Sequence, residues 1–279
     1  MIDERRVTHA GIATRQLSVE GDGPGIVLVH GFGHPADTWR PLLHRLERAE
    51  RRAVAVDLPG FGDADPLAPG PLLPGQDRFL AAVIAAHGRP VVVGNSLGAT
   101  LALRALTRDA PMSGAVLMAT AGAAWAPLIH TLPITHRIVG VAPWVPRVAQ
   151  AVLATLLYGD RRLADPRVVA DAIGRVRDRA TAAALIASGL HYKGEVQRAA
   201  LARITAPPGT PVTIVHGTRD RLVPVAVSRR LHTAIPHSRL VVLDGIGHCP
   251  QLDATERVAG LVLALLPAIG RAERDDEAS

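Results

Sequence analysis

Short apolar runs alternate with amphipathic stretches along the first 120 residues of the chain. The runs consist mostly of Val, Leu, Ile and Ala and occupy residues 25–30, 52–57, 90–94 and 114–118. Between them, apolar residues recur at helical spacing over 38–48, 76–87 and 97–107. Strands that are apolar throughout and separated by helices predict a parallel sheet covered by helices on both faces.

The alternation stops near residue 119 and resumes with apolar runs at 211–216 and 239–244 and a helical pattern at 255–266. The segment between, 121–206, carries several prolines and helical patterns but no strand-like run with clear boundaries. It is too long for an unstructured loop in a compact domain. We therefore predict an α/β core built from residues 1–120 and 207–279, with a helical cap, 121–206, inserted in it.

Three further stretches complete the prediction of the fold. Residues 7–20 are expected to form a strand or hairpin at one edge of the sheet, and the Pro- and Gly-rich residues 63–75 a loop. The charged end of the chain, 271–279, is expected to fray.

Composition excludes several classes of protein. In 279 residues, 48% are hydrophobic and 20% charged, which fits a globular α/β domain and not a disordered chain. The single cysteine, Cys249, excludes a disulfide framework and a multi-cysteine metal site. No apolar run approaches the ~18 residues of a membrane span, and residues 1–6 lack the apolar core of a signal peptide. We expect a cytoplasmic protein with no membrane partner.

The net charge of +6 raises the question of nucleic-acid binding. The arginines are scattered and usually have an acidic neighbour, Lys193 is the only lysine, and aromatic residues make up 3% of the chain. This pattern predicts no nucleic-acid partner, since net charge alone says little about function.

Residues 94–98 carry the most specific chemical signal in the chain. They read Gly-Asn-Ser-Leu-Gly, the G-x-S-x-G pattern, and lie directly between a predicted strand and a predicted helix. In this context the pattern indicates a nucleophile elbow, a sharp turn that lifts the serine hydroxyl above the sheet. Gly94 and Gly98 leave room for the close approach of strand and helix. Ser96 is therefore the candidate nucleophile.

A serine hydroxyl needs a base, and the chain supplies partners in the order Ser, Asp, His. Asp220 follows the run 211–216 and His248 follows the run 239–244, so both are expected where loops converge beyond the carboxyl ends of the strands. His248 would take the proton of Ser96, and Asp220 would orient the imidazole. The backbone N–H groups of Leu97 and Phe32 are the candidate oxyanion-hole donors. No paired spacing such as H-E-x-x-H suggests a metal site.

These motifs resemble those of the α/β-hydrolase fold, in its capped serine-hydrolase branch. The resemblance is carried by residues 30–33 (His-Gly-Phe-Gly), 57–62 (Asp-Leu-Pro-Gly-Phe-Gly), 94–98, 217–220 (Gly-Thr-Arg-Asp) and 247–248 (Gly-His), which appear in family order. It implies a cofactor-independent hydrolase with a small-molecule substrate. One departure is Ala99, where many relatives have a second glycine.

The substrate class is open at this level. We expect a carboxylic ester with an apolar part, because the apolar cap residues Trp125, Leu128 and Trp144 could line the site, although they could equally form the cap's own core. Asn95 resembles the residue before the serine in hydrolases that cleave the C–C bond of diketone-type compounds, yet Cys249 and not a Trp follows His248. A C–C hydrolase and a non-catalytic protein that binds a small ligand are therefore the alternatives. The oligomeric state is not predicted.

The remaining polar candidates receive structural interpretations. Asp57 and His30 are expected to support loops, His216 to end a core strand, and Cys249 to be structural. The histidines expected at the surface are His34, His44, His87, His232 and His237.

Overall fold

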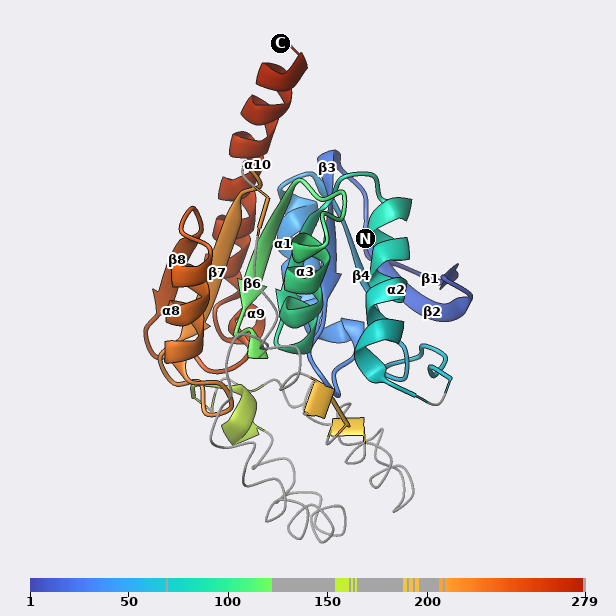
Figure 1. Ribbon diagram of the computed structural model, residues 1–279, viewed down its shortest axis with the longest axis vertical. Coiled ribbons are helices and arrows are strands. Elements are labelled where there is room, and N and C mark those ends of the chain that lie inside the picture. The colour runs from blue at the N-terminus through green and yellow to red at the C-terminus, as the bar shows by residue number, and fades with distance from the viewer. Residues whose placement is uncertain are drawn as a thin grey trace, which may run out of the picture.

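A single eight-stranded sheet runs through the described residues in the order β1-β2-β4-β3-β5-β6-β7-β8 (Figure 1). The computed structural model describes residues 1–68, 70–121, 154–160, 162, 164, 188–189, 191–192, 194–195, 206–207 and 209–277, with side chains of the last helix as far as residue 266. The strands are β1 (Asp3–His9), β2 (Ile12–Val19), β3 (Asp22–Val29), β4 (Arg51–Val56), β5 (Val91–Asn95), β6 (Gly114–Met118), β7 (Val212–Gly217) and β8 (Arg239–Leu243).

Strands β3 to β8 are parallel, whereas β1 and β2 form an antiparallel hairpin that joins the sheet through β4. This edge hairpin and the parallel core confirm the predicted α/β fold. Every residue of β5 and β6 is buried, as expected for strands covered on both faces.

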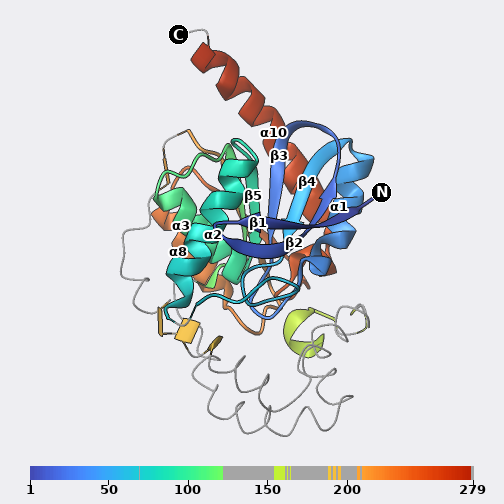
Figure 2. The same cartoon turned by 90° about the vertical axis from the view of Figure 1, so that its right-hand side faces the viewer.

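Helices cover both faces of the sheet (Figure 2). Their bounds are η1 (Ala36–Trp39), α1 (Arg40–Arg48), α2 (Leu72–Ala86), α3 (Leu97–Thr107), α8 (Val225–Ala234), α9 (Pro250–Asp253) and α10 (Thr255–Glu277). Helices α1 and α10 pack on one face, and α2, α3 and α8 pack on the other. No helix among the described residues is long and apolar enough to cross a membrane.

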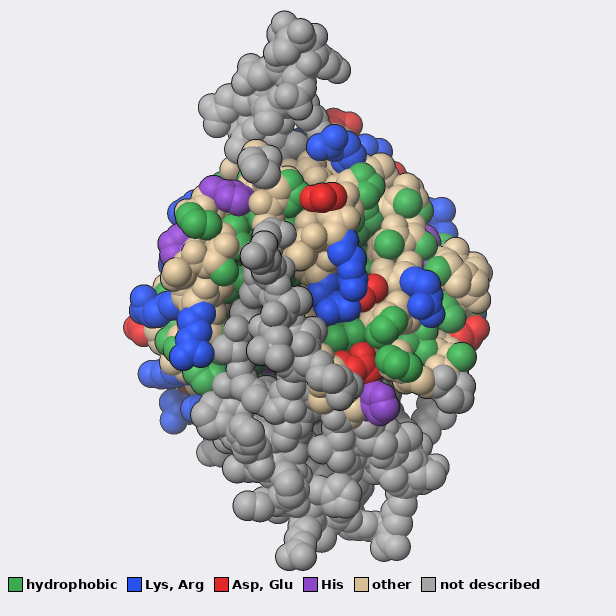
Figure 3. All heavy atoms as spheres, viewed as in Figure 1, with side chains coloured by type: hydrophobic (Ala, Val, Ile, Leu, Met, Phe, Trp, Pro, Cys, Tyr) green, Lys and Arg blue, Asp and Glu red, His purple; other side chains and the backbone are tan. Residues whose placement is uncertain are grey.

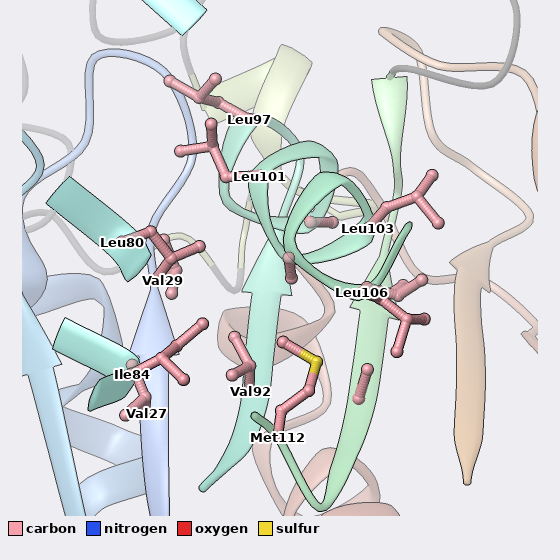
Figure 4. Close-up of a cluster of buried hydrophobic side chains, with 14 of the residues drawn as sticks. Val27, Val29, Leu80, Ile84, Val92, Leu97, Leu101, Leu103, Leu106 and Met112 are labelled. Atoms are coloured by element: carbon pink, nitrogen blue, oxygen red, sulfur yellow. The ribbon is translucent and has the colours of Figure 1, made fainter. Parts of the chain in front are cut away.

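Among the described helices, α3 is the best buried, and it follows the turn at Ser96. Its leucines meet Val29 of β3, Val92 of β5 and Leu80 and Ile84 of α2 in one apolar cluster (Figure 4). Burial of a side chain of this size stabilises the fold by about 1.5–3 kcal/mol. The packing therefore holds the N-terminus of α3 at the carboxyl end of β5.

Two helix boundaries differ from the prediction. Helix α2 begins at Leu72 instead of residue 76. Leu73 is buried in the core, and the amides of Leu72 and Leu73 both donate to the carboxylate of Glu195, which lies far along the chain. Helix α10 continues to Glu277, so the predicted end near 266 and the frayed tail are wrong. Six of the nine residues 271–279 are Ala, Arg or Glu, which favour helix, and the two Asp residues do not end α10 before Glu277.

Most of segment 121–206 lies outside the described residues. Its predicted bounds and cap architecture therefore stay a prediction. On the face shown in Figure 3, arginine side chains form separate groups among acidic and apolar ones. The absence of a nucleic-acid partner stays a prediction.

Candidate active site

Ser96 occupies a strained turn between β5 and α3. Its φ of 52° and ψ of −108° lie in a region that a non-glycine residue adopts at a cost of about 1–3 kcal/mol. A Cβ on Gly94 would lie 2.4 Å from the carbonyl carbon of Gly98, and one on Gly98 only 2.1 Å from the carbonyl oxygen of Val29. The two glycines thus allow the strand–helix contact that makes the turn sharp, as the motif predicts. Ser96 remains partly accessible.

Asp220 and His248 come together at the ends of β7 and β8. Asp220 Oδ2 lies 2.9 Å from His248 Nδ1, and the two side chains are 1% and 5% exposed. The other carboxylate oxygen, Oδ1, accepts the N–H groups of Leu222 and Val223 at 2.8 and 2.9 Å. Burial alone would raise the pKa of Asp220, but the charge and hydrogen bond of His248 and the Val223 amide outweigh it, so the pKa is lowered. The carboxylate is therefore held ionised against the Nδ1–H of His248.

His216 supports the same loop from beneath. It is fully buried at the end of β7, as predicted, with Nδ1 2.7 Å from the hydroxyl of Ser228. Its Nε2–H donates to the carbonyl of Val223 at 2.8 Å and lies 3.4 Å from Asp220 Oδ2. Burial lowers the pKa of His216, so it serves as a neutral support.

Asn95 connects the elbow to the histidine loop. Its Nδ2 donates to the carbonyl of His248 at 2.9 Å, and the thiol of Cys249 lies 3.7 Å from its Oδ1. Asn95 and Cys249 are both fully buried, and burial raises the pKa of the Cys249 thiol, consistent with its structural interpretation. The residue before Ser96 therefore holds the backbone of His248 directly.

The loop after β3 lies close to Ser96. A Cβ on Gly31 would lie 3.3 Å from the Cβ of Ser96. His30 Nε2 accepts the amide of Leu58 at 2.8 Å, which leaves Nδ1–H to donate to the carbonyl of Gly31, also at 2.8 Å. His30 supports this loop, as predicted, and so places Phe32 beside the elbow.

Asp57 fixes the far end of the same loop. Its fully buried carboxylate accepts the amides of Ala36 and Asp63 at 2.6 and 2.9 Å, and it pairs with Arg15 at 2.9 Å. These contacts confirm the structural interpretation of Asp57. They tie the loop after β3 to the loop after β4.

His34 is the clearest error of the sequence analysis. We expect it at the surface, but its side chain is buried, with an unpartnered Nδ1. Burial, together with the nearby His30 and His248, lowers its pKa to about 3. A polar residue type suggests exposure, and only its position directly after the His-Gly-Phe-Gly turn hints at a place within the site.

The predicted pocket residues Trp125, Leu128 and Trp144 lie outside the described residues. From the same segment, Tyr192 and Glu195 contact the core, and sequence analysis missed both. No sequence signal identifies them, because their partners are more than 90 residues away. Among the residues that the structure describes, no cluster of three or more His, Cys, Asp or Glu side chains could hold a metal ion.

Comparison with known proteins places this geometry in context. The model of the alpha/beta hydrolase family matches residues 26–261. Pimeloyl-[acyl-carrier protein] methyl ester esterase of Xanthomonas campestris pv. campestris is 31% identical over 265 residues, covering 87% of this chain and 95% of the esterase. An uncharacterized protein of Mycobacterium tuberculosis is 27% identical over 295 residues, covering 95% of this chain and 81% of its own length.

Two solved structures share the fold at lower identity. The 2-hydroxy-6-oxo-6-phenylhexa-2,4-dienoate hydrolase of Rhodococcus sp. strain RHA1 has a TM-score of 0.78 at 24% identity, covering 95% of this chain and 98% of that chain. A serine hydrolase involved in carbazole degradation has a TM-score of 0.75 at 22% identity, covering 96% and 99%. At this identity the likeness concerns the fold alone.

Proposed function

Because the chain belongs to the α/β-hydrolase family and is a hydrolytic enzyme, we propose that it cleaves a carboxylic ester with an apolar acyl or alcohol part. Ser96 is the proposed nucleophile, His248 the base and Asp220 its orienting acid. The observation that carries this proposal is the 2.9 Å contact between Asp220 and His248, joined through Asn95 to the strained turn at Ser96.

The proposed chemistry follows from the orientation of His248. Asp220 accepts from Nδ1–H, which leaves Nε2 as the basic nitrogen. As the hydroxyl oxygen of Ser96 attacks the ester carbonyl carbon, its proton passes to Nε2. The backbone N–H groups of Phe32 and Leu97 stabilise the oxyanion, a contribution of about 3–4 kcal/mol for one such donor.

Three proton transfers then complete the cycle. His248 protonates the departing alcohol as the carbonyl re-forms, leaving an acyl group on Ser96. Water loses a proton to His248 and attacks the acyl carbon, and the acid departs as Ser96 regains its proton. The cycle uses water and side chains of the chain, and no cofactor takes part in it.

An ester is favoured over a diketone-type substrate by two observations. The relative at 31% identity is named as a methyl ester esterase. Asn95, the residue that suggests C–C cleavage, has its amide nitrogen and oxygen engaged with the loop of His248 and Cys249. Its presence therefore has a structural reason that is independent of the bond being cleaved.

Two measurements test the proposal. A fluorophosphonate probe should label the wild-type protein at Ser96 and leave Ser96→Ala unlabelled. A panel of p-nitrophenyl esters of graded acyl length, run beside a methyl ester and a vinylogous diketone, should show ester turnover that Ser96→Ala abolishes. Faster cleavage of the diketone would identify a C–C hydrolase instead, and a folded protein with neither labelling nor turnover would identify a binding protein.

A further inference from the structure

The aromatic ring of Phe32 is held between two other aromatic rings. Phe61 meets it edge-on at a centroid distance of 5.1 Å, and Tyr192 stacks on it at 6.0 Å with an interplanar angle of 11°. Gly189 also lies against the ring, since a Cβ there would be 3.4 Å from Phe32 Cζ. Such aromatic pairs contribute orientation as well as apolar contact.

This contact matters because the backbone on either side of Phe32 is glycine. Gly31 precedes it, and Gly33 follows with a φ of +75°. Glycine restrains peptide orientation little. The Phe32 N–H nevertheless lies in one planar peptide with the Gly31 carbonyl, which accepts hydrogen bonds from His30 Nδ1–H at 2.8 Å and from the His34 amide at 3.2 Å. The Phe32 ring adds a second restraint, through Phe61 of the buried core and Tyr192 of segment 121–206.

Tyr192 also reaches the helix that carries the nucleophile. Its hydroxyl lies 3.4 Å from Thr100 Oγ1, and Thr100 Oγ1 in turn donates to the carbonyl of Ser96 at 3.0 Å. Burial raises the pKa of Tyr192 to about 12, so the phenol stays neutral. One side chain thus contacts both the Phe32 loop and the first turn of α3, the two elements that supply the proposed oxyanion donors.

Glu195 fixes the stretch that carries Tyr192 to the core. Its carboxylate is 7% exposed and accepts the amides of Leu72 and Leu73 at 2.5 and 2.6 Å. Helix α2 follows Pro71 with no side-chain cap and no acidic residue in its first turn. Glu195 therefore satisfies amides that the helix leaves free, and its negative charge lies at the favourable end of the helix dipole.

We propose, on the basis of the function proposed above, that Tyr192 is a positioning residue that acts through the Phe32 ring and, together with the hydrogen bond from His30 to the Gly31 carbonyl, holds the Phe32 amide in the oxyanion hole. Glu195 anchors Tyr192 in this role. The prediction is a loss of transition-state stabilisation without loss of substrate binding when the ring is removed.

The test compares Tyr192→Phe, which keeps the ring and removes the hydroxyl, with Tyr192→Leu, which removes the ring. With the shortest p-nitrophenyl ester, Tyr192→Leu should lower kcat at least about tenfold and change KM less than about twofold, because small misplacements of catalytic groups cost up to about a hundredfold. Tyr192→Phe should stay within about twofold of wild type. Affinity for a trifluoromethyl ketone, whose adduct places an oxyanion in the hole, should fall in parallel with kcat/KM.

Phe79→Leu is the matched control, because Phe79 is fully buried in α2 and its ring meets His9 of β1. It should lower the melting temperature and leave kcat unchanged at 25 °C. The end-point of fluorophosphonate labelling counts competent sites in each variant. If Tyr192→Leu does not fold, Glu195→Ala, which releases the same stretch, should show the same fall in kcat and inhibitor affinity.

Three outcomes overturn the inference. The first is wild-type kcat and inhibitor affinity in Tyr192→Leu. The second is a change in Tyr192→Leu that is confined to KM, which would make Tyr192 a wall of the substrate pocket. The third is a loss of kcat in Tyr192→Phe equal to that in Tyr192→Leu. Failure of the proposed function looks different, because Ser96→Ala would then retain ester turnover or the wild-type protein would have none.

Discussion

Each polar residue of the site has a separate geometric role. Asp220 receives two backbone amides on one oxygen and His248 on the other, while Asn95 holds the carbonyl of His248. His248 is thus restrained at both its imidazole ring and its backbone carbonyl. A catalytic base that must point at one hydroxyl requires such a fixed orientation. Two predictions belong to this scale.

The first prediction concerns the proposed triad. Ser96→Ala, Asp220→Asn and His248→Ala should each lower kcat by about a thousandfold or more, and the double variants should be scarcely slower than the single ones, because the residues act as a unit. Steady-state kinetics on the p-nitrophenyl panel measures this, with circular dichroism to show that the fold persists. Near-wild-type turnover in Asp220→Asn would remove Asp220 from the mechanism.

The second prediction concerns His34 and the stability of the fold. Its pKa is lowered from 6.5 to about 3, so between these values the unfolded chain binds a proton that the folded chain does not. The free energy of unfolding should therefore fall as the pH drops from 6.5 towards 3, with His34 contributing up to about 1.4 kcal/mol per pH unit. Above pH 6.5 this contribution no longer changes.

Urea unfolding at a series of pH values checks the effect of His34. His34→Leu and His34→Gln should differ in absolute stability but share the same reduced slope against pH, since neither can be protonated. A slope equal to that of the wild type in both variants would show that His34 is accessible to protons in the folded state.

At the scale of elements, the elbow depends on how closely β5, β3 and α3 approach one another. A side chain at Gly98 would collide with the backbone of Val29, whose position is fixed by hydrogen bonds to both neighbouring strands. Backbone cannot yield to a methyl group as the end of a side chain can, so the collision must displace the helix that carries Ser96.

A pair of glycine substitutions tests this constraint. Gly98→Ala should destabilise the protein by at least about 2 kcal/mol and abolish turnover, as overpacking of a close-packed core does. Gly260→Ala places the same methyl group on α10, where nothing lies within 4 Å, and should stabilise by up to about 1 kcal/mol through helix propensity. Thermal unfolding of both variants measures the changes in stability. A fully active Gly98→Ala would contradict this explanation of the elbow.

At the scale of the whole molecule, residues far apart in the chain complete one site. Leu72 and Glu195 are 123 residues apart, and Asn95 and His248 are 153 apart, yet each pair shares a hydrogen bond. The core therefore positions the proposed reacting groups, while part of segment 121–206 contacts the loop and helix around them.

The last prediction asks whether the remainder of this segment selects the substrate. Trp125→Ala, Leu128→Ala and Trp144→Ala should each shift the preferred acyl length on the ester panel while changing turnover of the shortest ester little, because removing a pocket wall affects only substrates long enough to reach it. Unchanged length profiles in all three variants would assign these residues to the core of the cap.

The sequence by itself determined the architecture of the core and the positions of the polar residues that end its strands. Apolar runs such as 90–94 and 114–118 have few alternatives to buried strands, and parallel strands bring their carboxyl ends to one edge. That local rule is enough to place Ser96, Asp220 and His248 at the same end of the sheet. The motif around Ser96 also predicts the strained turn, because its two glycines have no side chain and so allow strand and helix to approach closely.

Only the tertiary structure decided which side chains support those residues. Burial of His34, the start of α2 at Leu72 and the contacts of Asn95, Tyr192 and Glu195 all depend on partners distant in the chain. Local propensity and periodicity indicate which face of a segment packs on the core. They carry no information about which residue, distant in the chain, that face contacts. The proposed reacting groups can therefore be predicted from the sequence, whereas the contacts that orient them depend on the fold.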